Sequence, residues 1–204
     1  MGDSISHSII RSNVWRLLGV VMLLWSFTPA AHAQTIARAS VERIDPVVDN
    51  GQLNLDIDIA LQLNATMDQA LSRGVPLYFS LDLEIEQPRW WWFNKTIVET
   101  SLDRRLSYNA LMQSWRVSTG DLSIPTASFN EAVTLLSQIR NWPVVMSDRF
   151  EPNQQYTGRV RIRLDTDRLA RPLQMDSVNR SNWALNSPWK PFEFAIRRDA
   201  GQPQ

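Results

Sequence analysis

A group of acidic residues is the first candidate for catalysis, because of the spacing of its side chains. Asp82, Glu84 and Glu86 occupy alternate positions of one segment. In an extended strand this spacing places the three carboxylates on one face, about 7 Å apart. Glycosidases use two carboxylates about 5 to 10 Å apart, so the spacing alone is compatible with a hydrolase. A solvated strand face explains the same pattern without any chemistry, and we favour that interpretation, also for Asp56 and Asp58.

A stripe of arginines forms the second candidate group. Arg159, Arg161 and Arg163 alternate with apolar residues. Three guanidinium groups on one face could bind a phosphorylated or carboxylated ligand through bidentate hydrogen bonds. They could also lie beside an acidic strand, where each pair of opposite charges contributes about 0.2 to 1 kcal/mol. We predict the second arrangement, with the strand of Asp82 to Glu86 or that of Asp56 and Asp58 as the neighbour.

Three consecutive tryptophans, Trp90, Trp91 and Trp92, lie between two predicted strands. Alternation sends Trp90 and Trp92 to one side and Trp91 to the other, so they cannot all enter one core. Exposed tryptophans stack on sugars, insert at lipid interfaces or anchor protein partners. The structural alternative is that they plug one end of the fold. The candidate partner-binding residues are therefore Trp90, Trp91, Trp92, Arg159, Arg161 and Arg163.

Composition narrows the chemistry further. The chain has no cysteine, and both of its histidines, His7 and His32, fall within residues 1–33. A chain starting at Gln34 would therefore have no thiol nucleophile, no imidazole base and no histidine or cysteine ligand for zinc or haem. We expect no catalytic residue, no cofactor and no metal site.

The first 33 residues read as a secretion signal. Arg11 and Arg16 precede an apolar run from Leu17 to Phe27, and Ala31-His32-Ala33 forms a cleavage site. The run is shorter than the roughly 20 residues that span a bilayer. We predict cleavage before Gln34 and a periplasmic location, with an uncleaved membrane tether as the alternative. Residues 1–33 carry two arginines and one aspartate, so of 21 basic and 21 acidic residues 19 and 20 would remain. This net charge of −1 gives no bias toward nucleic acid.

Period-two alternation dominates the rest of the chain. The clearest strand runs from Leu53 to Leu63, and Asp49-Asn50-Gly51 is typical of a hairpin turn joining it to a strand over 38–44. Further strands are predicted over 77–85, 96–108, 114–119, 156–165 and 192–196, about seven in all.

Two capping boxes predict helices. The first capping box pairs Thr66 with Gln69, and the helix that it begins is predicted to end at Arg73-Gly74. The second pairs Ser128 with Glu131, and its helix is predicted to end before Trp142-Pro143.

These elements predict a mostly β fold, a two-layer antiparallel β-sandwich with two short helices, whose connectivity could be immunoglobulin-like. A barrel is the alternative. We predict one domain over 34–198 and a disordered tail over 199–204.

Several segments together resemble the exported proteobacterial family called domain of unknown function 4390. They are Pro88 to Trp92, Arg105 to Leu111, Trp115-Arg116-Val117, and Pro172 with Asn179 to Trp183. The resemblance covers the chain after residue 33 and implies no activity, cofactor or catalytic residue. It implies a membrane sensor kinase as a partner, because genes of the family often neighbour one.

We therefore expect a non-enzymatic envelope protein that binds or assists an envelope partner, such as the external domain of a sensor kinase. A glycan- or peptidoglycan-binding module that uses the exposed tryptophans is the alternative, and a carboxylate-based hydrolase is weaker than both.

Overall fold

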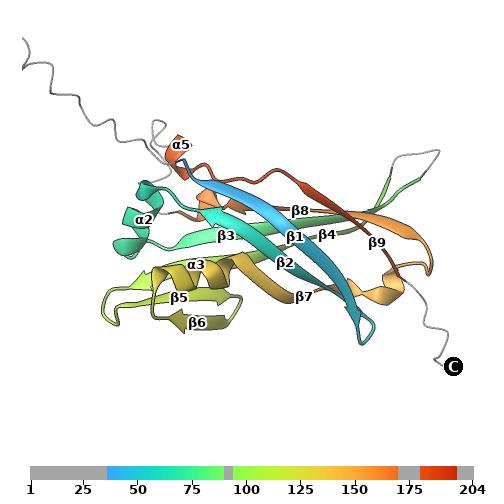
Figure 1. Cartoon of the computed structure of the whole chain (residues 1–204), viewed down its shortest axis with the longest axis horizontal. Helices are drawn as coiled ribbons and strands as arrows, with labels where there is room; N and C mark the ends of the chain where they lie inside the picture. The colour runs from blue at the N-terminus through green and yellow to red at the C-terminus, as the bar shows by residue number, and fades with distance from the viewer. Residues whose placement is uncertain (1–35, 90–93, 170–179, 197–204) are drawn as a thin grey trace, which may run out of the picture. The chain divides into compact units, whose positions relative to one another are not determined.

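The computed structural model describes residues 36–89, 94–169 and 180–196, all within a compact unit that begins at Thr35. The described residues form two antiparallel sheets (Figure 1). The smaller sheet contains β1 (Arg38–Asp49), β2 (Gln52–Gln62) and β7 (Gln138–Met146). The larger sheet contains β3 (Leu77–Gln87), β4 (Lys95–Asn109), β5 (Ser114–Thr119), β6 (Leu122–Thr126), β8 (Gln155–Leu164) and β9 (Lys190–Ala195).

The strand order is that of a variable-type immunoglobulin sandwich. In that fold, one sheet holds strands A, B, E and D, and the other holds C″, C′, C, F and G. The order β1-β2-β7 matches A-B-E, and the order β5-β4-β3-β8-β9 matches C″-C′-C-F-G. β6 adds a strand at the C″ edge, and α3 (Phe129–Ser137) takes the place of D along the chain. The predicted sandwich is confirmed.

The core lies between the two sheets and is built by the alternation seen in the sequence. Leu55 and Ile57 of β2 and Leu83 and Ile85 of β3 are fully buried. Each such side chain contributes about 1.5 to 3 kcal/mol relative to an exposed position. The turn between β1 and β2 has positive φ at Asn50 and Gly51, as a two-residue hairpin requires.

The first predicted helix forms, but with a different cap. α2 spans Ala65–Ser72, and the Asn64 side chain, not that of Thr66, accepts a hydrogen bond from the Met67 amide at 2.9 Å. Asn64 also donates to the Asn182 carbonyl at 2.7 Å, which ties α2 to α5 (Arg180–Trp183). A cap with this second, long-range bond could not be recognised from local spacing.

The second predicted helix is too long in the sequence interpretation. Ser128 caps α3 as expected, accepting from the Glu131 amide, but the helix ends at Ser137 and β7 follows at once. Trp142 and Pro143, expected beyond a helix end, lie inside β7. β6 and β7 are both missing from the predicted strands, and residues 36–89, 94–169 and 180–196 form nine strands where about seven were expected. Two short 3₁₀ turns, η1 (Ser147–Arg149) and η2 (Thr166–Arg168), flank β8.

Several predictions fall outside the described residues. These are the signal segment over 1–33, Trp90, Trp91 and Trp92, and the tail over 199–204. In the described part of the chain, no helix has the length and hydropathy to cross a membrane.

Candidate functional site

The outer face of the larger sheet brings the predicted arginine stripe together with acidic residues. β8 pairs with β3, and the register sets Arg159 opposite Glu84 and Arg161 opposite Asp82. Both Arg161 and Arg163 donate through Nε to Asp82 Oδ2, at 2.9 and 3.0 Å. Arg159 donates to Glu84 Oε2 through Nε at 2.8 Å, with a second contact from Nη2. The predicted pairing of the arginine strand with the strand of Asp82 to Glu86 is confirmed.

These ion pairs organise a surface more than they stabilise the fold. The arginine side chains are 33–48% exposed, and each solvent-exposed pair is worth only about 0 to 1 kcal/mol. A bidentate or shared carboxylate does, however, fix the orientation of a guanidinium group. The stripe is therefore a set of long side chains held in defined positions on an open face.

Trp189 extends this face at its β9 side. The guanidinium carbon of Arg161 lies 4.5 Å from the centre of the Trp189 ring, and that of Arg159 lies 4.9 Å away. These distances are typical of cation–π contacts. Trp189 precedes β9 outside any alternating run, so its position on this face had no signal in the sequence.

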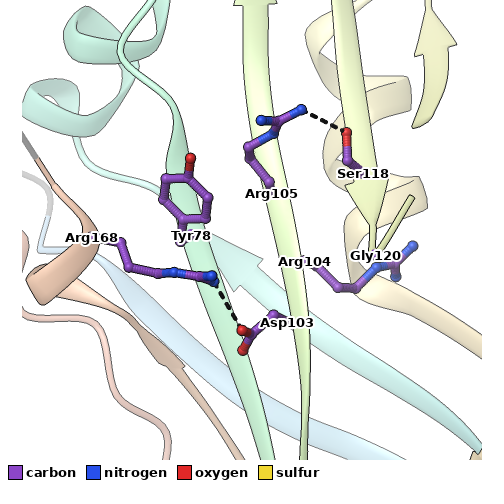
Figure 2. A pocket seen from close by; sticks show the side chains of 7 residues that line it. All are labelled: Tyr78, Asp103, Arg104, Arg105, Ser118, Gly120 and Arg168. Atoms are coloured by element: carbon purple, nitrogen blue, oxygen red, sulfur yellow. Dashed lines mark hydrogen bonds and ion pairs between the residues drawn. The ribbon is translucent and has the colours of Figure 1, made fainter. Parts of the chain in front are cut away.

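A second group stands at the other end of the face, beside β4 and β5 (Figure 2). Arg168 donates to Asp103 at 2.9 Å and lies 4.8 Å from the centre of the Tyr78 ring. Arg105, opposite Tyr78 in the register, donates to Ser118 Oγ at 3.3 Å. The side chains line a hollow of about 260 Å³. The sequence predicts a strand over 96–108 despite its less regular alternation, but Arg168 comes from η2, which was not predicted.

The carboxylates on this face lie side by side along the sheet. Asp82, Glu84 and Glu99 line a shallow hollow of about 470 Å³ with Arg161 and Arg163. Asp82 and Glu84 accept from arginine, and Glu99 lies opposite Glu84. Glycosidase carboxylates lie on either side of the bond that they cleave. By contrast, Asp82, Glu84 and Glu99 lie beside one another on one open surface.

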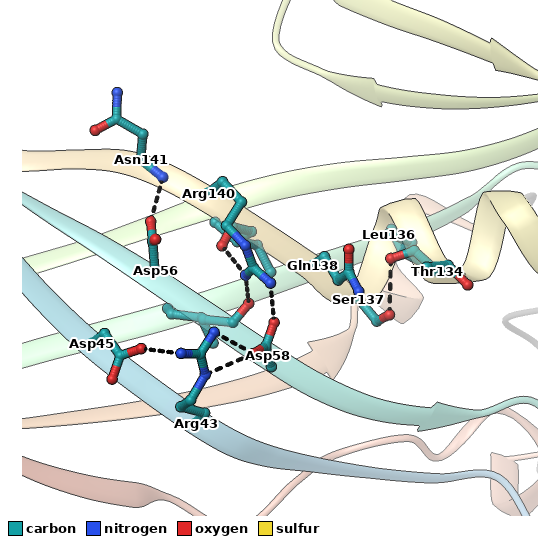
Figure 3. A network of polar contacts seen from close by, with 12 residues as sticks. Arg43, Asp45, Asp56, Asp58, Thr134, Leu136, Ser137, Gln138, Arg140 and Asn141 are labelled. Carbon is teal, nitrogen blue, oxygen red and sulfur yellow. Dashed lines mark hydrogen bonds and ion pairs between the residues drawn. The ribbon is translucent and has the colours of Figure 1, made fainter.

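The smaller sheet carries a separate charge network (Figure 3). Asp58 binds Arg140 Nη2 at 2.5 Å and Arg43 Nη2 at 2.8 Å. The pKa of Asp58 is lowered mainly by the hydrogen bond from Arg140, and next by the hydrogen bond from Arg43. Asp56 accepts from the amide of Asn141, whose φ of 53° marks an irregularity in the β2–β7 register. The acidic face of β2 therefore holds β7 in place.

No grouping of three or more histidine, cysteine, aspartate or glutamate side chains suited to a metal ion occurs within residues 36–89, 94–169 and 180–196.

Comparison with known proteins assigns the family. Neither the curated proteins nor the solved structures contain a match to the chain. The model of one family does match, over residues 37–193, a range that includes β1 to β8 in full and β9 up to residue 193. The chain therefore belongs to the family described as Domain of unknown function (DUF4390).

Proposed function

We propose that the chain is an exported, non-enzymatic envelope protein that binds a protein partner through the outer face of its larger sheet. The external domain of a membrane sensor kinase is the partner class that the family resemblance favours. Export is supported by the signal-like residues 1–33.

One observation carries the proposal, which is the fixed array of arginines and aromatic rings on that face. Arg159 and Arg161 are held by carboxylates on one side and by the Trp189 ring on the other. Tyrosine, tryptophan and arginine are the residues most enriched among binding hot spots. A side chain that is already ordered before binding loses less entropy in a complex. The face is therefore suited to a broad protein contact.

Photocrosslinking in intact cells tests the proposal. A photoreactive amino acid replaces Glu99, an exposed residue at the middle of this face, and a second chain carries it at Gln69 on exposed α2. We expect a discrete protein adduct from position 99 and none from position 69. Mass spectrometry of the adduct identifies the partner. Equal adducts from both positions would reject the proposed face.

Two alanine variants sharpen the test. Trp189→Ala should weaken capture at least tenfold, the loss expected for a hot spot of about 2 kcal/mol. Arg43→Ala, on the outer face of the smaller sheet, is the matched surface control and should leave capture unchanged. If Trp189→Ala captures as well as the parent chain while its melting temperature is also unchanged, the aromatic array is not the interface. The alternative glycan-binding function rests on Trp90, Trp91 and Trp92 and predicts a carbohydrate adduct instead.

Export is tested separately. The intact mass of periplasmic protein should correspond to a chain that starts at Gln34. Retention of residues 1–33 would place the protein on the membrane surface instead.

A further inference from the structure

The turn between β4 and β5 presents two large apolar side chains to solvent. Leu111 is 97% exposed and its neighbour Met112 is 66% exposed. Isolated exposed apolar residues are common on protein surfaces, but two consecutive ones at the end of a hairpin form a small apolar tip. The meaning of this tip depends on what surrounds it.

The tip is held in one conformation. The Asn109 side-chain oxygen accepts from the amides of both Leu111 and Met112 at 3.0 Å. Gln113 then adopts a φ of 49°, which closes the turn into β5. The two apolar side chains are thus presented by an ordered turn, so ordering it on contact with another surface costs little entropy.

An aromatic pair lies directly behind the tip. Tyr108 and Trp115 face each other across β4 and β5, with ring centres 4.8 Å apart, and both are only half buried. Tyrosine and tryptophan are amphipathic and concentrate at the boundary between water and lipid. Trp115 also packs on Phe129 of α3, with ring centres 5.0 Å apart, so the half-buried aromatic pair joins the apolar end of the hairpin to the rest of the fold.

The charged residues nearest the tip along the chain are arginines, and the nearest carboxylate on β4 is Asp103, which lines a hollow with Arg105. Residues 104–120 contain three arginines and no aspartate or glutamate. Arg104 is turned inward against α3, whereas Arg105 and Arg116 lie on the outer face. Neither of these two forms an ion pair with a carboxylate of the described chain, in contrast to the paired arginines of β8. Arg116 Nε is buried without a hydrogen-bond partner, and Arg116 Nη2 reaches Met112 Sδ at 3.6 Å.

We propose that the β4–β5 hairpin docks on the surface of an anionic lipid bilayer. Leu111 and Met112 enter the headgroup layer, Tyr108 and Trp115 lie at its boundary, and Arg105 and Arg116 contact lipid phosphates. Burying apolar side chains in the interface and attracting cations to anionic headgroups are the two contributions that peripheral membrane binding combines. Two arginines that form no ion pair with a carboxylate of the described chain favour an anionic bilayer over a protein surface of mixed charge. The hairpin is separate from the Trp189 end of the face proposed for a protein partner.

Vesicle co-sedimentation of the purified protein tests the proposal. Intact mass verifies that every variant has the same N-terminus as the parent. We expect the parent chain to bind vesicles of phosphatidylglycerol and phosphatidylcholine, and to bind pure phosphatidylcholine vesicles more weakly. Leu111→Gln should reduce the vesicle partition coefficient about tenfold, because burying one leucine side chain in the lipid interface raises that coefficient by this factor or more. Arg105→Gln with Arg116→Gln should reduce it about tenfold or more on anionic vesicles alone, because each arginine near an anionic surface adds attraction to it.

Matched controls separate the hairpin from general stickiness. Leu122→Gln removes another exposed leucine, 63% exposed, which lies on β6 opposite the far end of β5, and Arg149→Gln removes an exposed arginine in η1. Both should bind as the parent does. Because the chain has no cysteine, an environment-sensitive dye on Ala110→Cys reports insertion, and the same dye on Asp121→Cys should report none.

Several results would overturn the proposal. They are failure of the parent chain to bind anionic vesicles at low salt, equal losses in the hairpin and control variants, and a dye at position 110 that stays in water. Binding that does not distinguish anionic from neutral vesicles would remove the role of the arginines. Absent vesicle binding together with a protein crosslink from position 111 would identify the hairpin as a protein interface instead.

Discussion

Two adjacent arginines on β4 have opposite fates. Arg105 lies on the exposed outer face, whereas Arg104 points into the layer between the sheets and caps the end of α3. Arg104 Nη1 donates to the carbonyls of Leu136 and Gln138 at 2.9 and 3.2 Å, and Nε donates to Thr119 Oγ1 at 3.2 Å. Burial lowers the pKa of Arg104. A charged group near a helix C-terminus satisfies carbonyls that have no partner within the helix.

Replacing Arg104 should therefore destabilise the fold. Arg104→Ala removes the side-chain donor from the part-buried carbonyl of Leu136, and an unsatisfied buried polar group costs about 1 to 3 kcal/mol. Chemical denaturation measures the loss. Arg105→Ala is the matched neighbour and should change the free energy of unfolding by less than about 0.5 kcal/mol, as exposed substitutions generally do. Similar losses in both variants would show that Arg104 does not hold α3.

The carboxyl group of Asp68 on α2 should make the stability of the fold depend on pH with the opposite sign to that of a carboxylate in an ion pair. Asp68 lines a hollow of about 390 Å³ whose other lining residues are both apolar, such as Leu61 and Phe129, and polar, such as Asn130. Its Oδ1 atom is buried without a hydrogen-bond partner, and desolvation raises its pKa. A carboxyl whose folded-state pKa is raised contributes stability at low pH and loses it as pH rises through that pKa.

We therefore expect Asp68→Asn to raise the melting temperature at pH values above the raised pKa of Asp68, where the parent carboxylate is ionised. The difference from the parent should vanish at acidic pH, where both side chains are neutral. Calorimetry across the acid range measures it, with Asp121→Asn on an exposed turn as the control. A gain that does not depend on pH would mean that ionisation of Asp68 is not the cause.

At the scale of elements, β8 and β9 meet through a glycine that an aromatic ring covers. Gly158 pairs with Phe192, and a Cβ atom at Gly158 would lie 2.2 Å from the Phe192 ring. Its neighbour on the other side is Ile85 of the central strand β3. Phe192 in turn stacks on Phe194, with ring centres 5.9 Å apart. The φ of Gly158 is not positive, so its backbone conformation does not require glycine. What requires glycine at this position is the close approach of the Phe192 ring.

Gly158→Ala should accordingly destabilise the chain by about 1 to 3 kcal/mol, the usual cost of overpacking. Phe192→Leu replaces the rigid ring with a smaller side chain and should relieve part of the clash. The double variant is expected to lose less stability than the sum of the two single variants. Denaturation of all four chains completes the cycle, and strict additivity would contradict the packing argument.

The accuracy of the sequence interpretation varies between elements for physical reasons. β2, β3 and β8 have one face in the core and one in solvent, so alternation predicted both the strands and the neighbour of the arginine stripe. β7 follows α3 without a break, and its extended conformation depends on pairing with β2, which lies about 80 residues earlier. That pairing is non-local, and the helical spacing of Leu136 and Ile139 concealed it. The Trp189 contacts likewise depend on a register that only the assembled sheet defines.

At the scale of the whole molecule, the edges of the sheets share one feature. The four edge strands are β1, β7, β6 and β9, and each contains one proline: Pro46, Pro143, Pro125 and Pro191. The central strands β2, β3, β4, β5 and β8 contain none. Proline lacks an amide hydrogen, so it is tolerated at an edge and interrupts a ladder that another chain could extend. The prolines thus limit edge-to-edge association of two open sheets.

β6 is an edge where this protection should matter, because Leu122 and Ile124 on the same short strand are 63% and 37% exposed. Pro125→Val supplies an amide donor and a residue of high β propensity, and so converts β6 into a regular apolar edge. We expect this variant to self-associate at lower concentration than the parent, as measured by light scattering after size-exclusion chromatography over a range of loading concentrations. Pro152→Ala, in the exposed turn before β8, is the matched control and should behave as the parent. If Pro125→Val and the parent have the same mass at every concentration, pairing through β6 is prevented by something other than its proline, and the short length of the strand becomes the better explanation.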